Sequence, residues 1–246
     1  MGRTALITSG TAGIGERIVH AILGDALANI DAVFVNYGHD DDNAQRFLDA
    51  FSESDAVKIK LVKSDMSGED GLNTLTDAVL HSGRDVDWLI LNTGVGTYVP
   101  FASYDMALWN RILTTNVVIP AMLVQRLRRN IVDGGKILFM GSYAGIESYS
   151  GSVAYSASKA AVHQLAKSLV KEFDGQNICV NAVAPAFVET QWQENRSEES
   201  RARIRKKIAQ HRFGEPREIA ALCLSILLND YINGTVAEIT GGYNYF

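Results

Sequence analysis

The feature that most constrains the fold is a regular alternation of short apolar runs with segments of helical periodicity. The apolar runs predict seven buried strands, at 4–8, 32–37, 57–62, 86–91, 137–140, 178–184 and 236–240. Between them, apolar residues recur at the spacing of amphipathic helices, including a long region over 103–131 in which Pro120 is expected to produce a kink. The alternation predicts an α/β fold, a doubly wound sheet of seven mainly parallel strands with helices on both faces.

The domain organisation follows from length and from the evenness of the pattern. A chain of 246 residues fits one α/β domain, and we find no repeat, low-complexity tract or second domain, so we expect residues 1–246 to form a single domain. Residues 189–212 are polar and rich in Glu and Arg. They suggest either a mobile lid or a solvated surface helix, and the two are compatible.

Composition bears on several functional classes. A formal charge of −5 does not favour binding to nucleic acid or to an anionic membrane. No run approaches about 18 consecutive apolar residues, and the N-terminus shows no signal-peptide pattern, so we expect a cytoplasmic protein. Cys179 and Cys223 lie in apolar segments and are expected to be buried and unpaired, and the five histidines lack metal-ligand spacing.

A glycine-rich turn follows the first predicted strand and leads into a helix. Gly10, Gly13 and Gly15 lie in this turn, where backbone N–H groups and the helix N-terminus can approach a pyrophosphate. The alternative is that these glycines only allow a tight turn and bind no ligand. The position between strand and helix favours a dinucleotide site.

Three side chains suggest acid–base chemistry. Tyr155 and Lys159 are four apart in a helical segment and can share a face, and Ser142 follows a strand whose carboxyl end can meet them. An ammonium about 4–5 Å from a phenol, whose pKa is ordinarily ~10, would lower that pKa by about two to three units at most. Chance spacing and ordinary turn chemistry are the alternative explanation.

Taken together, these motifs resemble those of the short-chain dehydrogenase/reductase family, over essentially the whole chain. Residues 8–15 resemble its TGxxxGIG turn, 92–94 its NNAG motif and 181–185 its NxVxPG motif. Asn116, Ser142, Tyr155 and Lys159 match its catalytic tetrad, including YxxxK. The resemblance implies a Rossmann-type fold and an NAD(P)H-dependent oxidoreductase that interconverts a ketone or aldehyde and an alcohol. The general pattern is closest to that of the 3-oxoacyl-[acyl-carrier-protein] reductases.

The resemblance also implies a role for each matching residue. Tyr155 would donate the proton, Lys159 would lower its pKa and hold the nicotinamide ribose, Ser142 would position the substrate oxygen, and Asn116 would hold a proton-relaying water. The implied coenzyme-binding residues are Gly10, Thr11, Gly13, Ile14, Gly15, Tyr37, Asp65, Met66, Asn92, Gly94, Tyr155, Lys159, Pro185, Val188 and Thr190.

Three positions depart from the family pattern. Ser9 replaces a glycine of the coenzyme turn, at a cost on the order of 1 kcal/mol if the residue needs a positive φ. Leu91 replaces the first Asn of NNAG and removes a polar tie between central strands. Ala186 replaces the glycine after Pro185 and adds a methyl group beside the expected nicotinamide position.

The end of the second strand governs the choice of coenzyme. An acid there would favour NAD, but the matching position holds Tyr37, so we expect NADP(H) to be favoured over NAD(H). Asp40, Asp41 and Asp42 would restore the preference for NAD if one of them pointed inward. They are expected instead to cap the helix that begins near Asn43.

Two hypotheses about function remain open. The first is an active carbonyl reductase or alcohol dehydrogenase acting on a small molecule, and the second is a non-catalytic, dinucleotide-binding regulator. We also expect a homotetramer, because the helices around 104–130 and 155–172 carry more apolar residues than one sheet face needs. These residues are Leu108, Ile112, Val117, Leu123, Leu127, Val162, Leu165 and Leu169. The alternative is that all of them face the sheet.

Overall fold

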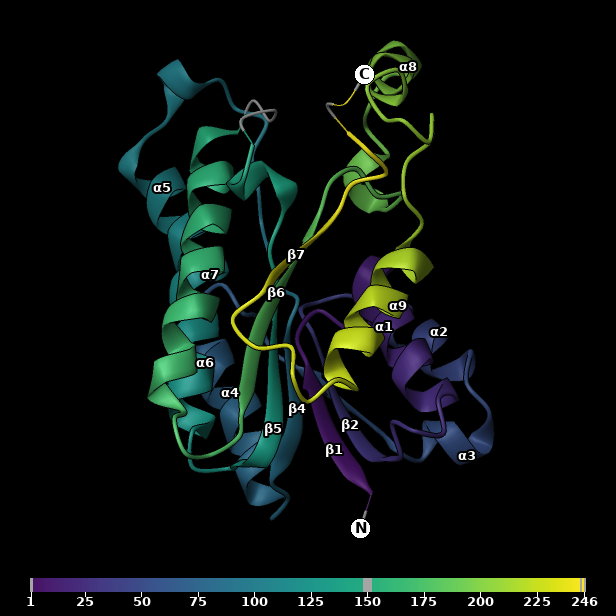
Figure 1. The fold of residues 1–246 in the computed structure, drawn as a ribbon, viewed down its shortest axis with the longest axis vertical. Helices are drawn as coiled ribbons and strands as arrows, with labels where there is room; N and C mark the ends of the chain where they lie inside the picture. Colours follow the sequence, from purple (N-terminus) through teal and green to yellow (C-terminus); the bar gives the residue numbers. More distant parts are fainter. Residues whose placement is uncertain (1, 148–151, 244, 246) are drawn as a thin grey trace.

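Seven strands form one parallel sheet within the part of the chain that the computed structural model describes, residues 2–147, 152–243 and 245. Their order is β3-β2-β1-β4-β5-β6-β7, and every neighbouring pair is parallel (Figure 1). The strands are β1 (Arg3–Ile7), β2 (Ile30–Tyr37), β3 (Ile59–Lys63), β4 (Val86–Leu91), β5 (Ile131–Met140), β6 (Cys179–Pro185) and β7 (Val236–Ile239). The predicted fold class is confirmed.

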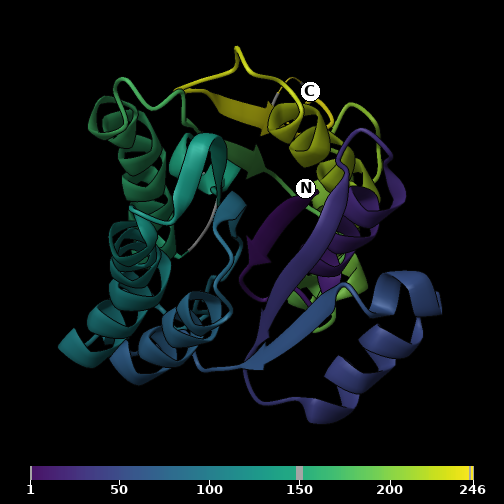
Figure 2. The same cartoon turned by 90° about the horizontal axis from the view of Figure 1, so that it is seen from below.

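Helices cover both faces of the sheet, on opposite sides of it in Figures 1 and 2. On one face α1 and α9 pack together over a core that includes Ile18, Val35 and Cys223. On the other face α4, α6 and α7 enclose a second core around Leu75, Leu123 and other apolar side chains. The helices are α1 (Gly13–Gly24), α2 (Asp41–Asp49), α3 (Glu53–Ala56), α4 (Glu69–His81), α5 (Met106–Leu113), α6 (Ile119–Leu127), α7 (Val153–Glu172), α8 (Glu198–Arg205) and α9 (Pro216–Leu227).

The order of the strands locates the ligand-binding edge. The chain runs outward from β1 to β3 in one direction and then from β4 to β7 in the other, so the order reverses between β1 and β4. In open α/β sheets ligands bind at such a reversal, beyond the carboxyl ends of the strands. That edge is the upper one in Figure 1, where α8 lies.

The helical region predicted over 103–131 is not one kinked helix. It consists of a 3₁₀ turn (Phe101–Ser103), α5, a π-helical turn (Thr114–Val118) and α6. Pro120 lies in the first turn of α6, where its missing N–H is best tolerated. The hydrogen-bond register therefore changes just before the proline. Within the described residues one helical stretch, Met106–Leu127, has the length and apolarity of a membrane span, and this is weak evidence because core helices pass the same test.

The segment 189–212 folds back onto the carboxyl edge of the sheet. It contains a 3₁₀ turn (Gln191–Gln193) and α8, and its two ends meet where the N–H of Glu189 donates to the carbonyl oxygen of Gly214. Ile204 and Ile208 of this segment pack with Phe213 in a small apolar cluster. Part of the segment is therefore buried. Cys179 and Cys223 are buried and unpaired, as predicted.

Candidate active site

The glycine-rich turn after β1 adopts a strained conformation at Ser9, whose φ is +49°. The side-chain hydroxyl of Ser9 lies 2.7 Å from that of Thr93, and its backbone N–H donates to Asn36. The serine that replaces a glycine therefore occupies the left-handed region itself, and Gly10 does not take its place in the turn. Its hydroxyl gains a hydrogen bond with the end of β4 that a glycine could not make.

Buried polar side chains tie the strand ends together at this edge. The hydroxyl oxygen of Thr8 accepts hydrogen bonds from the backbone N–H groups of Asn92 and Thr93, at 2.9 and 3.0 Å. Asn36 accepts from Ser9 and donates to both the carbonyl and the hydroxyl oxygen of Ser64, so it joins the ends of β1, β2 and β3. These hydrogen bonds link the strand ends even though Leu91 replaces the Asn that would provide a polar link there. Sequence reasoning missed Asn36, and its signal was an amide inside an apolar strand.

The turn leads into a helix end whose N–H groups have no side-chain cap. Ala12 is the N-cap of α1 and makes no capping hydrogen bond, and Gly13 follows with a φ of +55°. At Gly15 a Cβ atom would lie 2.3 Å from the carbonyl oxygen of Ser9, so only glycine fits there. A pyrophosphate accepts hydrogen bonds from such N–H groups and is favoured by the helix dipole.

A cavity of about 330 Å³ opens between this helix end and the strand ends. Nine of the fifteen predicted coenzyme-binding residues line it: Gly13, Ile14, Asn92, Gly94, Tyr155, Lys159, Pro185, Val188 and Thr190. Of the rest, Gly10 and Thr11 lie in the turn before α1 and Gly15 in the first turn of α1. Tyr37, Asp65 and Met66 lie at or just past the ends of β2 and β3. The residues present therefore fit a dinucleotide that runs along this edge.

Ser142, Tyr155 and Lys159 come together where β5 ends and α7 begins. The side chains of Ser142 and Tyr155 share a hydrogen bond. The Lys159 ammonium donates to the carbonyl oxygen of Met140 at 2.7 Å and lies 5.7 Å from the centre of the Tyr155 ring. The spacing of four residues thus brings the phenol and the amine together as predicted. Residues 148–151, between Ser142 and Tyr155, are outside the described residues.

The expected effect of Lys159 on Tyr155 is not found. Burial raises the pKa of Tyr155, and the hydrogen bond from Ser142 opposes this rise without cancelling it. Burial also lowers the pKa of Lys159, from 10.5 to about 8. Coulomb attraction alone would lower the pKa of Tyr155, but desolvation by burial is the largest cause of the shift in both groups. Tyr155 is consequently protonated at neutral pH.

The side chain of Asn116, on the π-helical turn, connects the segment around Val95 to α7. Its amide exchanges two hydrogen bonds with the backbone of Val95 and donates a third to Ser158 on α7. Both amide hydrogens are thereby used, so a water would have to be held by another group.

His163 supports Ser142 from below. It lies one turn after Lys159 on α7, is buried, and its Nε2 accepts a hydrogen bond from the Ser142 backbone N–H at 3.3 Å. A Cβ atom at Gly141 would lie 2.3 Å from that nitrogen, so the glycine lets the chain pass close to the ring. Burial, with help from Lys159, lowers the pKa of His163 to about 4 and keeps the ring neutral. Sequence reasoning missed this role, although the spacing 155, 159, 163 signalled a shared helix face.

A second cleft, of about 710 Å³, meets the first at Ser142 and Tyr155. Its walls come from residues 96–100 on one side and from the segment 189–212 on the other. Trp192 belongs to both cavities, and its ring centre lies 5.5 Å from that of Tyr155. The hydroxyl of Tyr98 donates to the Trp192 carbonyl oxygen and links the two walls. The two cavities both reach Tyr155, so a molecule bound in the second cleft can place one end beside its hydroxyl.

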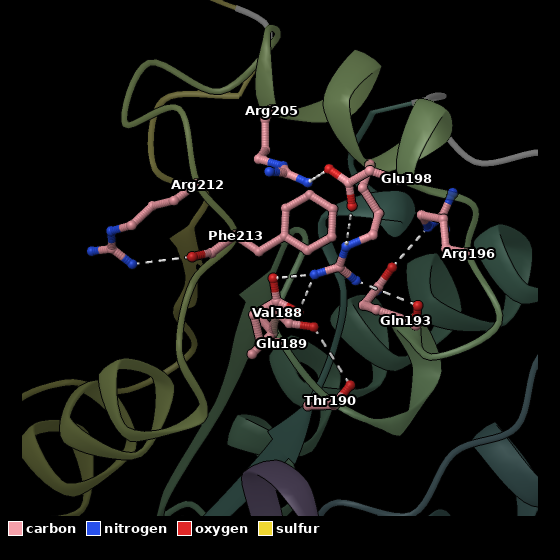
Figure 3. Close-up of polar contacts among 10 residues, drawn as sticks. Val188, Glu189, Thr190, Gln193, Arg196, Glu198, Arg205, Arg212 and Phe213 are labelled. Carbon is pink, nitrogen blue, oxygen red and sulfur yellow. Dashed lines mark hydrogen bonds and ion pairs between the residues drawn. The ribbon is translucent and has the colours of Figure 1, made fainter.

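Ion pairs anchor the segment 189–212 on its outer side (Figure 3). Arg201 bonds to Glu189, just past β6, and also to Glu198, which in turn pairs with Arg205. The Arg201 guanidinium lies 4.9 Å from the ring centre of Phe213. This network fixes α8 against the end of β6, next to Thr190 of the coenzyme cavity.

Comparison with known proteins identifies related sequences along the whole chain. A family model described as short chain dehydrogenase matches residues 3–201. The 3-oxoacyl-[acyl-carrier-protein] reductase FabG of Aquifex aeolicus is 29% identical over 245 residues, covering 98% of this chain and 97% of the relative. The rhamnolipids biosynthesis 3-oxoacyl-[acyl-carrier-protein] reductase of Pseudomonas aeruginosa is 30% identical over 254 residues, covering 99% and 96%.

Solved structures show the same fold. The RhlG/NADP active-site complex from Pseudomonas aeruginosa has a TM-score of 0.86 and 29% identity, covering 99% of this chain and 96% of that one. BdcA in complex with NADPH has a TM-score of 0.86 and 25% identity, covering 99% and 95%.

Proposed function

This chain belongs to the short-chain dehydrogenase family, and from that premise we propose that it reduces the keto group of a 3-oxoacyl compound with NADPH. It is an NAD(P)H-dependent oxidoreductase that interconverts a carbonyl compound and an alcohol. Neither the site nor the relatives named above favour the alternative of a non-catalytic regulator. The 3-oxoacyl assignment rests on the relatives and on the second cleft, of about 710 Å³, which adjoins Tyr155.

The observation that carries the proposal is the position of Tyr155. Its phenol lies where the coenzyme cavity and the second cleft meet, hydrogen-bonded to Ser142. Its pKa is raised by burial, so the hydroxyl holds its proton at neutral pH and is available as a general acid. Reduction therefore uses the form of Tyr155 that is populated at neutral pH, whereas oxidation of an alcohol would use its phenolate.

The roles proposed for this chain's residues follow from their contacts. Tyr155 donates a proton to the substrate oxygen, and the Ser142 hydroxyl donates a hydrogen bond to the same atom as negative charge develops there. Lys159, whose pKa of about 8 leaves it mainly protonated at neutral pH, holds the nicotinamide ribose. Asn116 positions the segment around Gly94 and Val95, and its backbone carbonyl oxygen is the proposed holder of the relay water. The coenzyme, when bound, supplies the hydride.

The proposed preference for NADPH rests on the end of β2. Tyr37 occupies the position at which an acid would bind the ribose hydroxyls of NAD, and its hydroxyl donates to Asp41 at 2.9 Å. Asp40 caps α2 through the N–H of Asn43, as expected, although the helix begins at Asp41 rather than near Asn43. Asp41 also pairs with the Lys63 ammonium, which offsets its charge. Two related solved structures, one in complex with NADPH and one with NADP, support the same preference.

The domain organisation, the cellular location and the oligomeric state are also part of the proposal. Residues 1–246 act as one nucleotide-binding domain in which the segment 189–212 is the lid. The protein is cytoplasmic and works as a homotetramer on a small-molecule substrate.

A substrate panel with purified protein tests the proposed function. NADPH oxidation is followed with 3-oxoacyl thioesters, neutral ketones and aldehydes, each at neutral pH. We expect turnover with the 3-oxoacyl compounds and faster turnover with NADPH than with NADH. Absence of coenzyme oxidation with every carbonyl, while NADPH still binds, would contradict the proposal and favour the regulator.

A further inference from the structure

The second cleft is positively charged although the chain as a whole carries a formal charge of −5. Three cations, Arg196, Arg203 and Lys207, line it, and its described lining contains no Asp or Glu. They lie on the wall formed by α8 and the residues around it, whereas Ser142 and Tyr155 lie where the cleft meets the coenzyme cavity. The cleft therefore combines a reducing centre with a separate cationic wall.

The arginines on the other face of α8 are neutralised. Arg201 and Arg205, four apart, pair with Glu189 and Glu198 (Figure 3). Beyond α8, Arg212 pairs with Glu218 and Arg217 with Glu215. Each of these arginines has an acidic partner, so its positive charge is already balanced within the protein.

The three cations of the cleft lack such partners in the described residues. Arg203 is displaced by two residues from both Arg201 and Arg205, which on a helix is nearly the opposite face. Lys207 follows Arg203 at the same four-residue spacing, and both side chains are exposed. Arg196 donates only to neutral groups, the Gln193 amide and the Ser200 hydroxyl, and lies over the Phe187 ring. All three charges are left uncompensated at the cleft.

We propose that Arg196, Arg203 and Lys207 bind an anionic group, a carboxylate or a phosphate, on the substrate whose carbonyl meets Ser142 and Tyr155. Guanidinium and ammonium groups that line one cleft without acidic partners bind such oxyanions through charge-assisted hydrogen bonds. Exposed apolar side chains of Tyr98, Val99 and Trp192 line the same cleft and suit the carbon chain of such a substrate. This inference rests on the proposed carbonyl reduction and specifies the class of substrate, an anionic oxo compound.

Three substrates that share a 3-oxo group and differ in charge test the proposal. Ethyl acetoacetate is neutral, acetoacetate carries a carboxylate, and acetoacetyl-coenzyme A carries phosphates. The double variant Arg203→Gln/Lys207→Gln is compared with the wild type, with Lys206→Gln as the matched control. Lys206 is an exposed cation in the same turn and does not line the cleft.

We expect the double variant to lose about tenfold in kcat/KM for at least one anionic substrate, while its value for ethyl acetoacetate and the control's values stay within about twofold. Raising the salt concentration should reduce the wild-type advantage for the same substrate. Loss with acetoacetate alone identifies a carboxylate as the anion, and loss with the coenzyme A thioester alone identifies a phosphate. Equal losses for all three substrates, or no loss for any, would overturn the proposal.

A binding measurement keeps this test separate from that of the proposed function. If the wild type reduces none of the three substrates, the proposed reduction of 3-oxoacyl compounds is wrong. Calorimetric titration of the NADP-saturated protein with acetoacetate and with coenzyme A then decides the question of the anion site. Weaker binding to the double variant than to the wild type and Lys206→Gln supports the site, and equal or undetectable binding in all three proteins refutes it.

Discussion

Ser9 is a residue whose unfavourable backbone conformation is offset by its side chain. Its φ of +49° costs on the order of 1 kcal/mol for a residue with a Cβ atom, while its hydroxyl bonds to Thr93 across the ends of β1 and β4. Both Ser9→Ala and Ser9→Gly remove the hydrogen bond, but only the glycine relieves the strain. We expect Ser9→Gly to be about 1 kcal/mol more stable than Ser9→Ala in urea unfolding without coenzyme. Equal stabilities would show that the turn relaxes around alanine.

The buried position of His163 makes the stability of the fold depend on pH, and it fixes the sign of that dependence. Its pKa is about 4 in the folded chain against an ordinary 6.5, so the unfolded chain binds a proton first as the pH falls. Stability is then lost between pH 6.5 and about 4, by up to about 3 kcal/mol, and no further loss from this group follows below that range.

His163→Gln tests this dependence, because the glutamine amide can still accept from the Ser142 N–H but does not titrate. Unfolding by urea is measured for both proteins from pH 7 to about pH 4. We expect the wild type to lose more stability than the variant across that range, since only the wild type carries the neutral imidazole. Parallel curves for the two proteins would show that the ring is protonated in the folded state as readily as in the unfolded chain.

The junction of β2 with α2 governs the choice of coenzyme at the scale of elements. Asp41, at the start of α2, holds the Tyr37 hydroxyl and the Lys63 ammonium at the ends of β2 and β3. Asp41→Asn removes a negative charge and frees that ammonium. We expect the ratio of NADPH to NADH affinity to rise, on the order of tenfold at low ionic strength. Dissociation constants measured at one ionic strength check this.

Asp42→Asn is the matched control for this junction, because it removes a neighbouring carboxylate with no ion pair in the described residues. Its ratio of affinities should stay close to that of the wild type. If Asp41→Asn instead weakened both coenzymes alike, the aspartate would act on the shape of the junction and not on its charge.

Sequence patterns predicted the elements well where apolar runs end in glycine or polar residues. The strand over Val86–Leu91 has the predicted limits, whereas β5 begins at Ile131, before two glycines that mimic a turn. The π-helical turn at Asn116 escaped prediction, because its register depends on contacts with Val95 and Ser158 from distant parts of the chain. Likewise the positions of Ser142, Tyr155 and Lys159 were predictable from spacing, but the raised pKa of Tyr155 depends on burial that spacing does not report.

At the scale of the whole molecule, the proposed tetramer depends on the apolar surfaces of α5, α6 and α7. Four of the eight apolar residues expected to be surplus, Ile112, Leu123, Leu127 and Val162, are buried within the monomer. The remainder, Leu108, Val117, Leu165 and Leu169, are half-buried, and Val118 beside them is 45% exposed. Val117, Leu165 and Leu169 also pack against the second core, so the apolar surplus is smaller than the sequence indicated and is clearest at the exposed Val118.

Light scattering at micromolar concentration tests the tetramer. We expect a mass close to four chains for the wild type and a lower mass for Val118→Lys, because a charge would be buried in the contact. Val57→Lys, at an equally apolar and more exposed position after α3, should leave the mass unchanged. A monomeric wild type would contradict the proposal.

The most direct test of the central claim, that Tyr155 is the proton donor of a carbonyl reductase, is the single-turnover rate of Tyr155→Phe with NADPH and the best substrate of the panel. We predict a loss of roughly 10²–10⁴-fold in the rate, with the NADPH dissociation constant and the thermal unfolding midpoint close to those of the wild type. Tyr231→Phe, at a fully exposed site, should keep the full rate. A Tyr155→Phe protein that reduces its substrate at a near-normal rate would contradict the account.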